Sequence, residues 1–316
     1  MGKSVGARSR IDFRGALTAF GRMERKDHMD LFGAVALIAF ALHLAFNQVV
    51  VKVTAGGFSP VFSAGLRSAG AVVVLLIWMK LRGVSLHIPR RAMLGGILSG
   101  LFFALEFTGL FLALDMSTVS RVSVIFYTMP VWLAIIGHFV LPGEALTQAK
   151  ILGLLMAVAG VVIAMLDRDA AHVSWTGDIL ALASAFCWAG IVLCVRITPL
   201  SEVPPAQQLL FQVFVSAPIL LLIAPLFGPL IRDIEPIHIA GLLFQIVAVA
   251  SLGFLAWFWL MTIYPASSVA SFSFLSPVFS VILGWLLLSE RVALPVWGAL
   301  VLVAAGIYLI NRKPRA

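Results

Sequence analysis

Four side chains that can bind ligands or exchange protons lie deep inside long apolar stretches of this chain: His43, Arg67, Glu106 and Tyr127. At a rise of 1.5 Å per helical residue, each lies about 10–12 Å from the nearer end of its stretch. If these stretches cross a bilayer, a charge at that depth costs roughly 2.5–3.5 kcal/mol and normally faces a cavity or a partner. We therefore expect the four groups to gather at one level.

Arg67 and Glu106 have two interpretations, and the sequence leaves both open. A guanidinium offers a planar fork that suits a carboxylate, so the two residues can form an ion pair that locks their helices together. Alternatively, Arg67 binds a carboxylate or phosphate of a substrate while Glu106 accepts an amine or a proton. His43 likewise either exchanges protons near neutral pH or forms one hydrogen bond to a neighbouring helix.

Further polar and aromatic candidates are spread along the chain. Asn47 lies four residues after His43, so it shares a helix face and extends a polar strip. Gln48 and the serines of the apolar run 266–288 are assigned to helix packing. In the second half of the chain the candidates are Trp188, Gln212, Gln245 and Trp257. The tryptophans are interpreted either as walls of a binding site or as residues of the membrane interface.

No pattern typical of catalysis, metal binding or nucleotide binding occurs in the sequence. It lacks a P-loop, a His-Glu-x-x-His zinc motif and a Gly-x-Ser-x-Gly nucleophile motif. We therefore predict no enzyme activity, no catalytic residue, no cofactor, no metal site and no direct drive by ATP. The two cysteines, Cys187 and Cys194, are interpreted as small buried apolar residues.

The composition is typical of a membrane protein and excludes a soluble domain. Apolar residues make up 61 % of the chain and charged residues 11 %, and a bilayer core of about 30 Å needs about 20 apolar residues per helix. Ten runs approach that length: 31–52, 60–79, 93–114, 119–141, 148–166, 177–197, 207–228, 238–260, 266–288 and 294–311. The polar, basic residues 1–30 lack the apolar core of a cleaved signal peptide, so we predict a cytoplasmic tail.

The net charge of +8 is distributed as an orientation signal rather than as a surface for nucleic acid. With the N-terminus in the cytoplasm, sixteen of the 22 lysines and arginines fall on the cytoplasmic side of the ten runs. That bias predicts that both chain ends are cytoplasmic in a multi-pass protein of a cell inner membrane. The lipid bilayer is therefore an expected partner, and nucleic acid is not.

The second half of the chain repeats the first, with an offset of 144 to 147 residues. Pro130-Val131-Trp132 corresponds to Pro277-Val278-Phe279, and Arg67 corresponds to Gln212. We expect a first repeat over 31–166 and a second over 177–311, each with five spans. An odd number of spans turns the second copy upside down, which is the design of alternating-access carriers.

These blocks give the chain its resemblance to a known family. Residues 130–144, followed by Gly153 and the pair Ala159-Gly160, recur as 277–291 followed by Ala305-Gly306. In these features the chain resembles the drug/metabolite transporter superfamily, specifically its EamA-type ten-helix permeases. The resemblance implies an all-α membrane protein of two inverted five-helix repeats. It implies that helices 1–4 and 6–9 surround a central cavity, with helices 5 and 10 at the periphery or at a homodimer contact.

We therefore expect a secondary transporter that exports or exchanges amino acids or related small metabolites by alternating access, with protons as a candidate coupling ion. A protein of the same fold that translocates lipid headgroups or drugs, or an uptake permease, is the alternative. Two local features accompany this expectation. Pro130, Pro218 and Pro277 should kink or break their helices. Glu144 and Glu290, just before spans 5 and 10, should cap helix N-termini.

Overall fold

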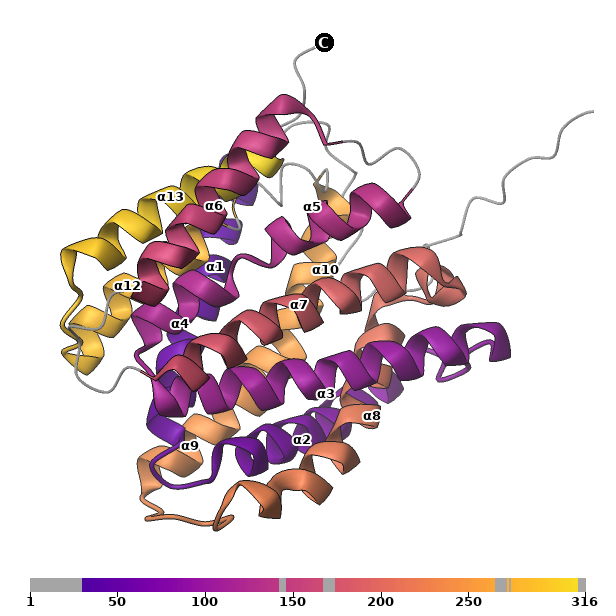
Figure 1. Ribbon diagram of the computed structural model, residues 1–316. Helices are drawn as coiled ribbons and strands as arrows, with labels where there is room; N and C mark the ends of the chain where they lie inside the picture. Colours follow the sequence, from indigo (N-terminus) through magenta and orange to yellow (C-terminus); the bar gives the residue numbers. More distant parts are fainter. Residues whose placement is uncertain (1–29, 142–145, 167–173, 265–271, 273, 312–316) are drawn as a thin grey trace, which may run out of the picture.

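The computed structural model describes residues 30–141, 146–166, 174–264, 272 and 274–311 (Figure 1). Within these ranges the regular secondary structure is helical, apart from one isolated β-bridge between Phe58 and Ile231. The predicted all-α fold is therefore confirmed. Residues 1–29 of the predicted tail and Glu144 lie outside the described residues.

Nine helical stretches in the described residues are long and apolar enough to cross a bilayer, and they agree with nine of the ten predicted runs. Six are built on single long helices: α1 (Leu31–Thr54), α2 (Pro60–Leu81), α3 (Met93–Met116), α6 (Gln148–Leu166), α7 (Trp175–Ile197) and α13 (Leu294–Asn311). One combines α8 (Pro205–Ile223) with η4 (Ala224–Phe227). Another joins α9 (Pro236–Phe244), the π-helix η5 (Gln245–Gly253) and α10 (Phe254–Ile263). The one predicted run that is not matched by a full-length helix, 266–288, is represented by the shorter α12 (Leu275–Leu288).

The remaining stretch, the fourth span, is broken in its middle. It consists of α4 (Val119–Phe126) and α5 (Met129–Val140), separated by Tyr127 and Thr128. Pro130 explains the break, because proline lacks the N–H that would continue the helical hydrogen bonds, yet suits the first turn of a new helix. Pro277 likewise lies in the first turn of α12, whereas α8 continues through Pro218 without ending.

The last spans of the two repeats, α6 and α13, pack directly against each other (Figure 1). A Cβ atom added to Gly153 would lie 2.7 Å from the carbonyl oxygen of Gly306, and one added to Gly160 would lie 2.8 Å from that of Ala299. Glycine thus allows the two backbones to touch. Since the earlier residue of α6 meets the later residue of α13, the helices are antiparallel. Equivalent helices of the two repeats therefore run in opposite directions, as predicted.

Each end of the bundle joins one loop from each repeat. At the end that we call the α1–α2 end, residues 55–59 meet residues 228–235. Ser59 N donates to Leu230 O at 2.9 Å, and Arg232 N donates to Gly57 O at 2.9 Å. At the opposite, α2–α3 end, residues 82–92 meet residues 198–204. There Arg91 pairs with Glu202, and Ala92 is buried with Leu200 and Val203.

Candidate functional site

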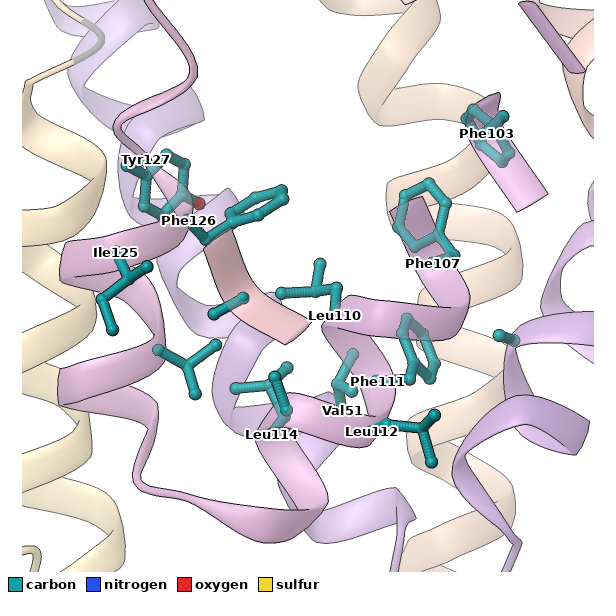
Figure 2. Close-up of a cluster of buried hydrophobic side chains, with 14 of the residues drawn as sticks. Val51, Phe103, Phe107, Leu110, Phe111, Leu112, Leu114, Ile125, Phe126 and Tyr127 are labelled. Carbon is teal, nitrogen blue, oxygen red and sulfur yellow. The ribbon is translucent and has the colours of Figure 1, made fainter. Parts of the chain in front are cut away.

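Arg67 lies in the interior of the bundle beside a column of aromatic rings on α3. Only 2 % of the residue is exposed, and its guanidinium carbon lies 3.9 Å from the ring centre of Phe107 and 5.5 Å from that of Phe111. Figure 2 shows Phe103, Phe107 and Phe111 following one another along α3. Such cation–π contacts stabilise a desolvated guanidinium without using its N–H groups. Nε and Nη1 of Arg67 have no hydrogen-bond partner among the described residues.

Glu106 interacts electrostatically with Arg67 but does not bind it directly. Both side chains are buried, and no ion pair within 4 Å joins them in the described part of the chain. The interpretation as a helix-locking ion pair is therefore not what the structure shows. Glu106 also lies near the thiol of Cys187 on α7. Two donor atoms of Arg67 consequently remain available to an anion.

Tyr127 lies at the break of the fourth span and faces three polar side chains. Gln48 of α1 and Ser276 and Ser280 of α12 lie near its hydroxyl. We call these four residues the Tyr127 cluster. Gln48 Oε1 and Ser280 Oγ are buried without a hydrogen-bond partner in the described residues. Buried polar atoms are normally paired, so such atoms indicate a place for water or a ligand.

Aromatic rings form the wall beside the Tyr127 cluster. Trp188 of α7 stacks on Phe126, with ring centres 5.0 Å apart and an angle of 17° between the planes. Tyr127 meets the same indole edge-on at 6.1 Å. Phe126 and Tyr127 lie across the buried cluster from the α3 phenylalanines in Figure 2. The structure thus places Trp188 beside Tyr127, and its role as a wall of a binding site stays a prediction.

Two sets of contacts fix the position of α4, the half-helix that ends just before Tyr127. Glu290 accepts hydrogen bonds from Val119 N at 2.6 Å, Ser120 N at 2.9 Å and Ser120 Oγ at 2.6 Å. The predicted capping by Glu290 is confirmed, but the capped helix is α4 and not α13. Arg121 donates to both carboxylate oxygens of Asp178 on α7 at 2.7 and 2.8 Å, and both side chains are buried. Glu290 and Asp178 of the second repeat therefore position the break in the fourth span of the first repeat.

His43 and Gln245 take part in a separate contact, between α1 and η5. His43 Nε2 lies 3.1 Å from Ala248 O, and because a carbonyl accepts, the imidazole nitrogen is the donor. This is the single hydrogen bond to a neighbouring helix that one interpretation predicted. Gln245 donates to Thr54 Oγ1 at 3.0 Å, while its own oxygen has no partner among the described residues. A π-helix at this contact is a frequent mark of functional sites.

The other predicted site residues are not gathered at one place. Gln212, the counterpart of Arg67, donates to Ser99 Oγ at 2.9 Å and so joins α8 to α3. Asn47 is buried with its Oδ1 atom unpartnered among the described residues. Trp257 stacks on Phe40 at 4.8 Å, in a cluster with Leu37 that is separate from the main core. A role for any of them in binding stays a prediction, as does the central cavity.

Several residues that the sequence analysis assigned to packing or to the span ends are central in the structure. Gln48, Ser276 and Ser280 belong to the Tyr127 cluster. Local sequence patterns mark neither Arg121 nor its partner Asp178 as a site residue. A lone aspartate at the start of an apolar run was the available signal, because a buried carboxylate requires a partner.

At the α1–α2 end a second ion pair joins the repeats. Arg232 donates to the two carboxylate oxygens of Asp115 at 2.8 and 2.9 Å and to Ala55 O at 2.8 Å. The hydrogen bonds that Arg232 donates to the Asp115 carboxylate raise the pKa of Arg232 above its usual value. Lys52 Nζ donates to Leu114 O at 2.6 Å and to Ser117 O at 2.9 Å, which satisfies carbonyls at the C-terminal end of α3.

Comparison with known proteins gives consistent matches over almost the whole described chain. The model of the EamA-like transporter family matches twice, over residues 31–166 and 175–312. A probable amino-acid metabolite efflux pump of Escherichia coli (strain K12) is 29 % identical over 299 residues, covering 91 % of this chain and 95 % of that protein. The uncharacterized transporter YvbV of Bacillus subtilis (strain 168) is 30 % identical over 218 residues, covering 68 % and 69 %. A solved crystal structure with 22 % identity aligns with a TM-score of 0.63, covering 87 % of this chain and 96 % of that chain.

Proposed function

The chain belongs to the EamA-like transporter family, and from that premise we propose that it is a secondary carrier that exports amino acids or related small metabolites. It is a multi-pass membrane protein and a transporter, not an enzyme. The name of the Escherichia coli relative, which mentions amino-acid metabolites, supports the substrate class by similarity.

The observation that carries this proposal is the break at Tyr127 with its unpaired polar neighbours. Within a bilayer, non-helical backbone is tolerated only where it is buried in protein or lines a water-filled cavity. Broken helices in corresponding positions of two repeats mark the binding site in many carriers. Here the fourth span is broken just before Pro130, whose counterpart Pro277 lies in the first turn of α12, and both places contribute to the Tyr127 cluster.

The chemistry of these groups fits a small amphiphilic zwitterion. The open N–H groups of Arg67 suit a carboxylate, and Glu106 offers a negative charge to an ammonium group. The hydroxyl and amide groups of the Tyr127 cluster supply hydrogen bonds, and the rings of Phe126 and Trp188 cover an apolar part. Proton exchange at Glu106 is the coupling that we propose, and a homodimer stays a prediction.

The mechanism that we propose is alternating access by two inverted repeats, residues 31–166 and 177–311. Both chain ends then lie in the cytoplasm and the α1–α2 end faces outward. Tags at the two termini, tested for protease access in sealed cells, check this orientation. Protection of one tag only would contradict it.

Flux through reconstituted liposomes tests the substrate class. We expect the wild type to exchange a labelled amino acid. A labelled phospholipid should move between the leaflets no faster than it does in protein-free liposomes. Arg67→Gln, which copies the neutral Gln212 of the second repeat, and Tyr127→Phe should each lower exchange at least about tenfold, since a lost charge-assisted hydrogen bond is worth about 1.5–3 kcal/mol.

The matched control is Lys80→Gln, an exposed cation at the end of α2, which should exchange like the wild type. Equal amounts of protein must insert in every case. Lipid scrambling without amino-acid exchange would overturn the proposal in favour of headgroup translocation. An imposed pH gradient that leaves exchange unchanged would remove proton coupling at Glu106.

A further inference from the structure

A cavity of about 1110 Å³ opens beside the loop that joins α12 to α13, apart from the Tyr127 cluster. The residues that define its chemistry are Ile282, Trp285, Leu286, Glu290, Arg291 and Trp297. Successive residues of an α-helix are 100° apart, so the apolar side chains of α12 that line the cavity project from the face opposite Ser276 and Ser280. One helix therefore separates the cavity from the proposed substrate site.

The floor of the cavity is apolar and open. Ile282, Trp285 and Leu286 are 37 %, 55 % and 60 % exposed. The two helices diverge because α12 packs on α1 and α4 whereas α13 packs on α6. In a bilayer, such a floor lies at the depth of the acyl chains.

Two charged residues, Glu290 and Arg291, line the mouth of the cavity, and only the positive charge of Arg291 is available to a ligand. Glu290 lines the mouth, but three donors of α4 already occupy its carboxylate. Arg291 is exposed, and within the described residues its guanidinium has no recorded hydrogen bond or ion pair. Trp285 and Trp297 flank it. Indole rings favour the level of the lipid headgroups, and a guanidinium binds phosphate through two parallel hydrogen bonds.

We infer that this cavity is a phospholipid-binding site, with the lipid phosphate at Arg291 and an acyl chain along Ile282, Trp285 and Leu286. The volume is just above the usual range of about 300–1,000 Å³ for small-molecule pockets, which is enough for a headgroup and part of a chain. The available guanidinium of Arg291 selects a phosphate rather than an ammonium group. The inference requires a membrane-embedded protein but no particular substrate.

Native mass spectrometry of the purified full-length protein tests the inference. Dioleoyl phosphatidylglycerol is added to the detergent-solubilised protein, and dioleoylglycerol, which has the same chains without the phosphate, is added in parallel. We expect one phosphatidylglycerol to bind the wild type at least tenfold more tightly than dioleoylglycerol. Arg291→Gln should remove that preference, and Trp285→Ala should weaken both lipids. Because both side chains are exposed, neither change should alter the thermal unfolding temperature of the lipid-free protein.

The matched control is Arg82→Gln, an exposed arginine at the opposite end of the bundle, which should bind phosphatidylglycerol like the wild type. Inorganic phosphate should not displace the lipid, because it lacks the chain. Equal phosphatidylglycerol binding by the wild type and Arg291→Gln would overturn the inference. So would a lipid-free dimer that shields Trp285, since a second copy would then fill the cavity. Neither result bears on amino-acid exchange, so this test fails independently of the proposed function.

Discussion

At the α1–α2 end, residues 55–59 and 228–235 are joined by a β-bridge of two backbone hydrogen bonds, and Arg232 of the second loop pairs with Asp115 at the end of α3. At the α2–α3 end, the equivalent loops of the opposite repeats, 198–204 and 82–92, are joined by Arg91 and Glu202 and by a bond from Gln207 to Ser85 O. The side chains of the first ion pair are 34 % and 26 % exposed, and those of the second are 66 % and 42 % exposed.

The difference in exposure between the two ion pairs indicates which end of the bundle opens more easily. Exposed ion pairs contribute at most about 1 kcal/mol because water competes with them, whereas half-buried bidentate pairs are screened less. The α1–α2 end also contains the fully buried pair of Arg121 and Asp178. We therefore expect the carrier without substrate to keep its α1–α2 end closed and to open at the α2–α3 end. An exporter needs that preference if the α2–α3 end faces the cytoplasm.

The largest expected effect comes from the buried pair. Asp178→Asn leaves the Arg121 charge without its counter-ion, which typically costs about 3–5 kcal/mol. We expect a lower unfolding temperature and a lower yield of folded protein, measured by fluorescence-detected size exclusion after heating. The double variant Arg121→Met with Asp178→Asn removes the uncompensated charge and should recover part of the loss. A double variant no more stable than the single one would contradict this explanation.

A smaller effect is expected from Asp115→Asn, which removes the carboxylate that binds Arg232. We expect the α1–α2 end to open about fivefold more often, corresponding to about 1 kcal/mol. The measurement uses Ser117→Cys, a buried position at that end, in a background with Cys187 and Cys194 replaced by alanine. A membrane-impermeant thiol reagent should label this cysteine about fivefold faster in the Asp115→Asn variant. Unchanged labelling would contradict the expectation that this ion pair keeps the α1–α2 end closed.

The smallest effect is expected from Glu202→Gln at the α2–α3 end. Its partner Arg91 is mostly exposed, so the change should cost less than about 0.5 kcal/mol. Labelling of Ser117→Cys should not respond, because the altered contact lies at the other end of the bundle. Thermal unfolding provides the second measurement. A loss of stability as large as that caused by Asp115→Asn would mean that the two ion pairs stabilise their ends of the bundle equally.

The spans were predictable because the thickness of a bilayer sets the length of each apolar run. The ends of the predicted runs 60–79 and 148–166 agree with α2 and α6 to within two residues. The break at Tyr127 followed from Pro130, since proline acts locally whatever surrounds it.

The contacts between the repeats were not predictable from local patterns. Tyr127 meets Gln48 and Ser280 only because α1, α4 and α12 converge, and Glu290 caps a helix 171 residues away in the chain. His43 was expected at the depth of Arg67, but depth alone does not name its partner. The structure joins His43 to the π-helix η5, which apolar periodicity does not encode.

The glycine contact between α6 and α13 has a consequence for the symmetry of the molecule. With the offset of 146 residues, Gly160 is equivalent to Gly306 and Gly153 to Ala299. The contact of Gly160 with Ala299 therefore maps onto the contact of Gly306 with Gly153. Reciprocity of this kind is the signature of a two-fold axis. Each half of this chain therefore presents a self-complementary helix face, and the two halves pair through it in opposite orientations.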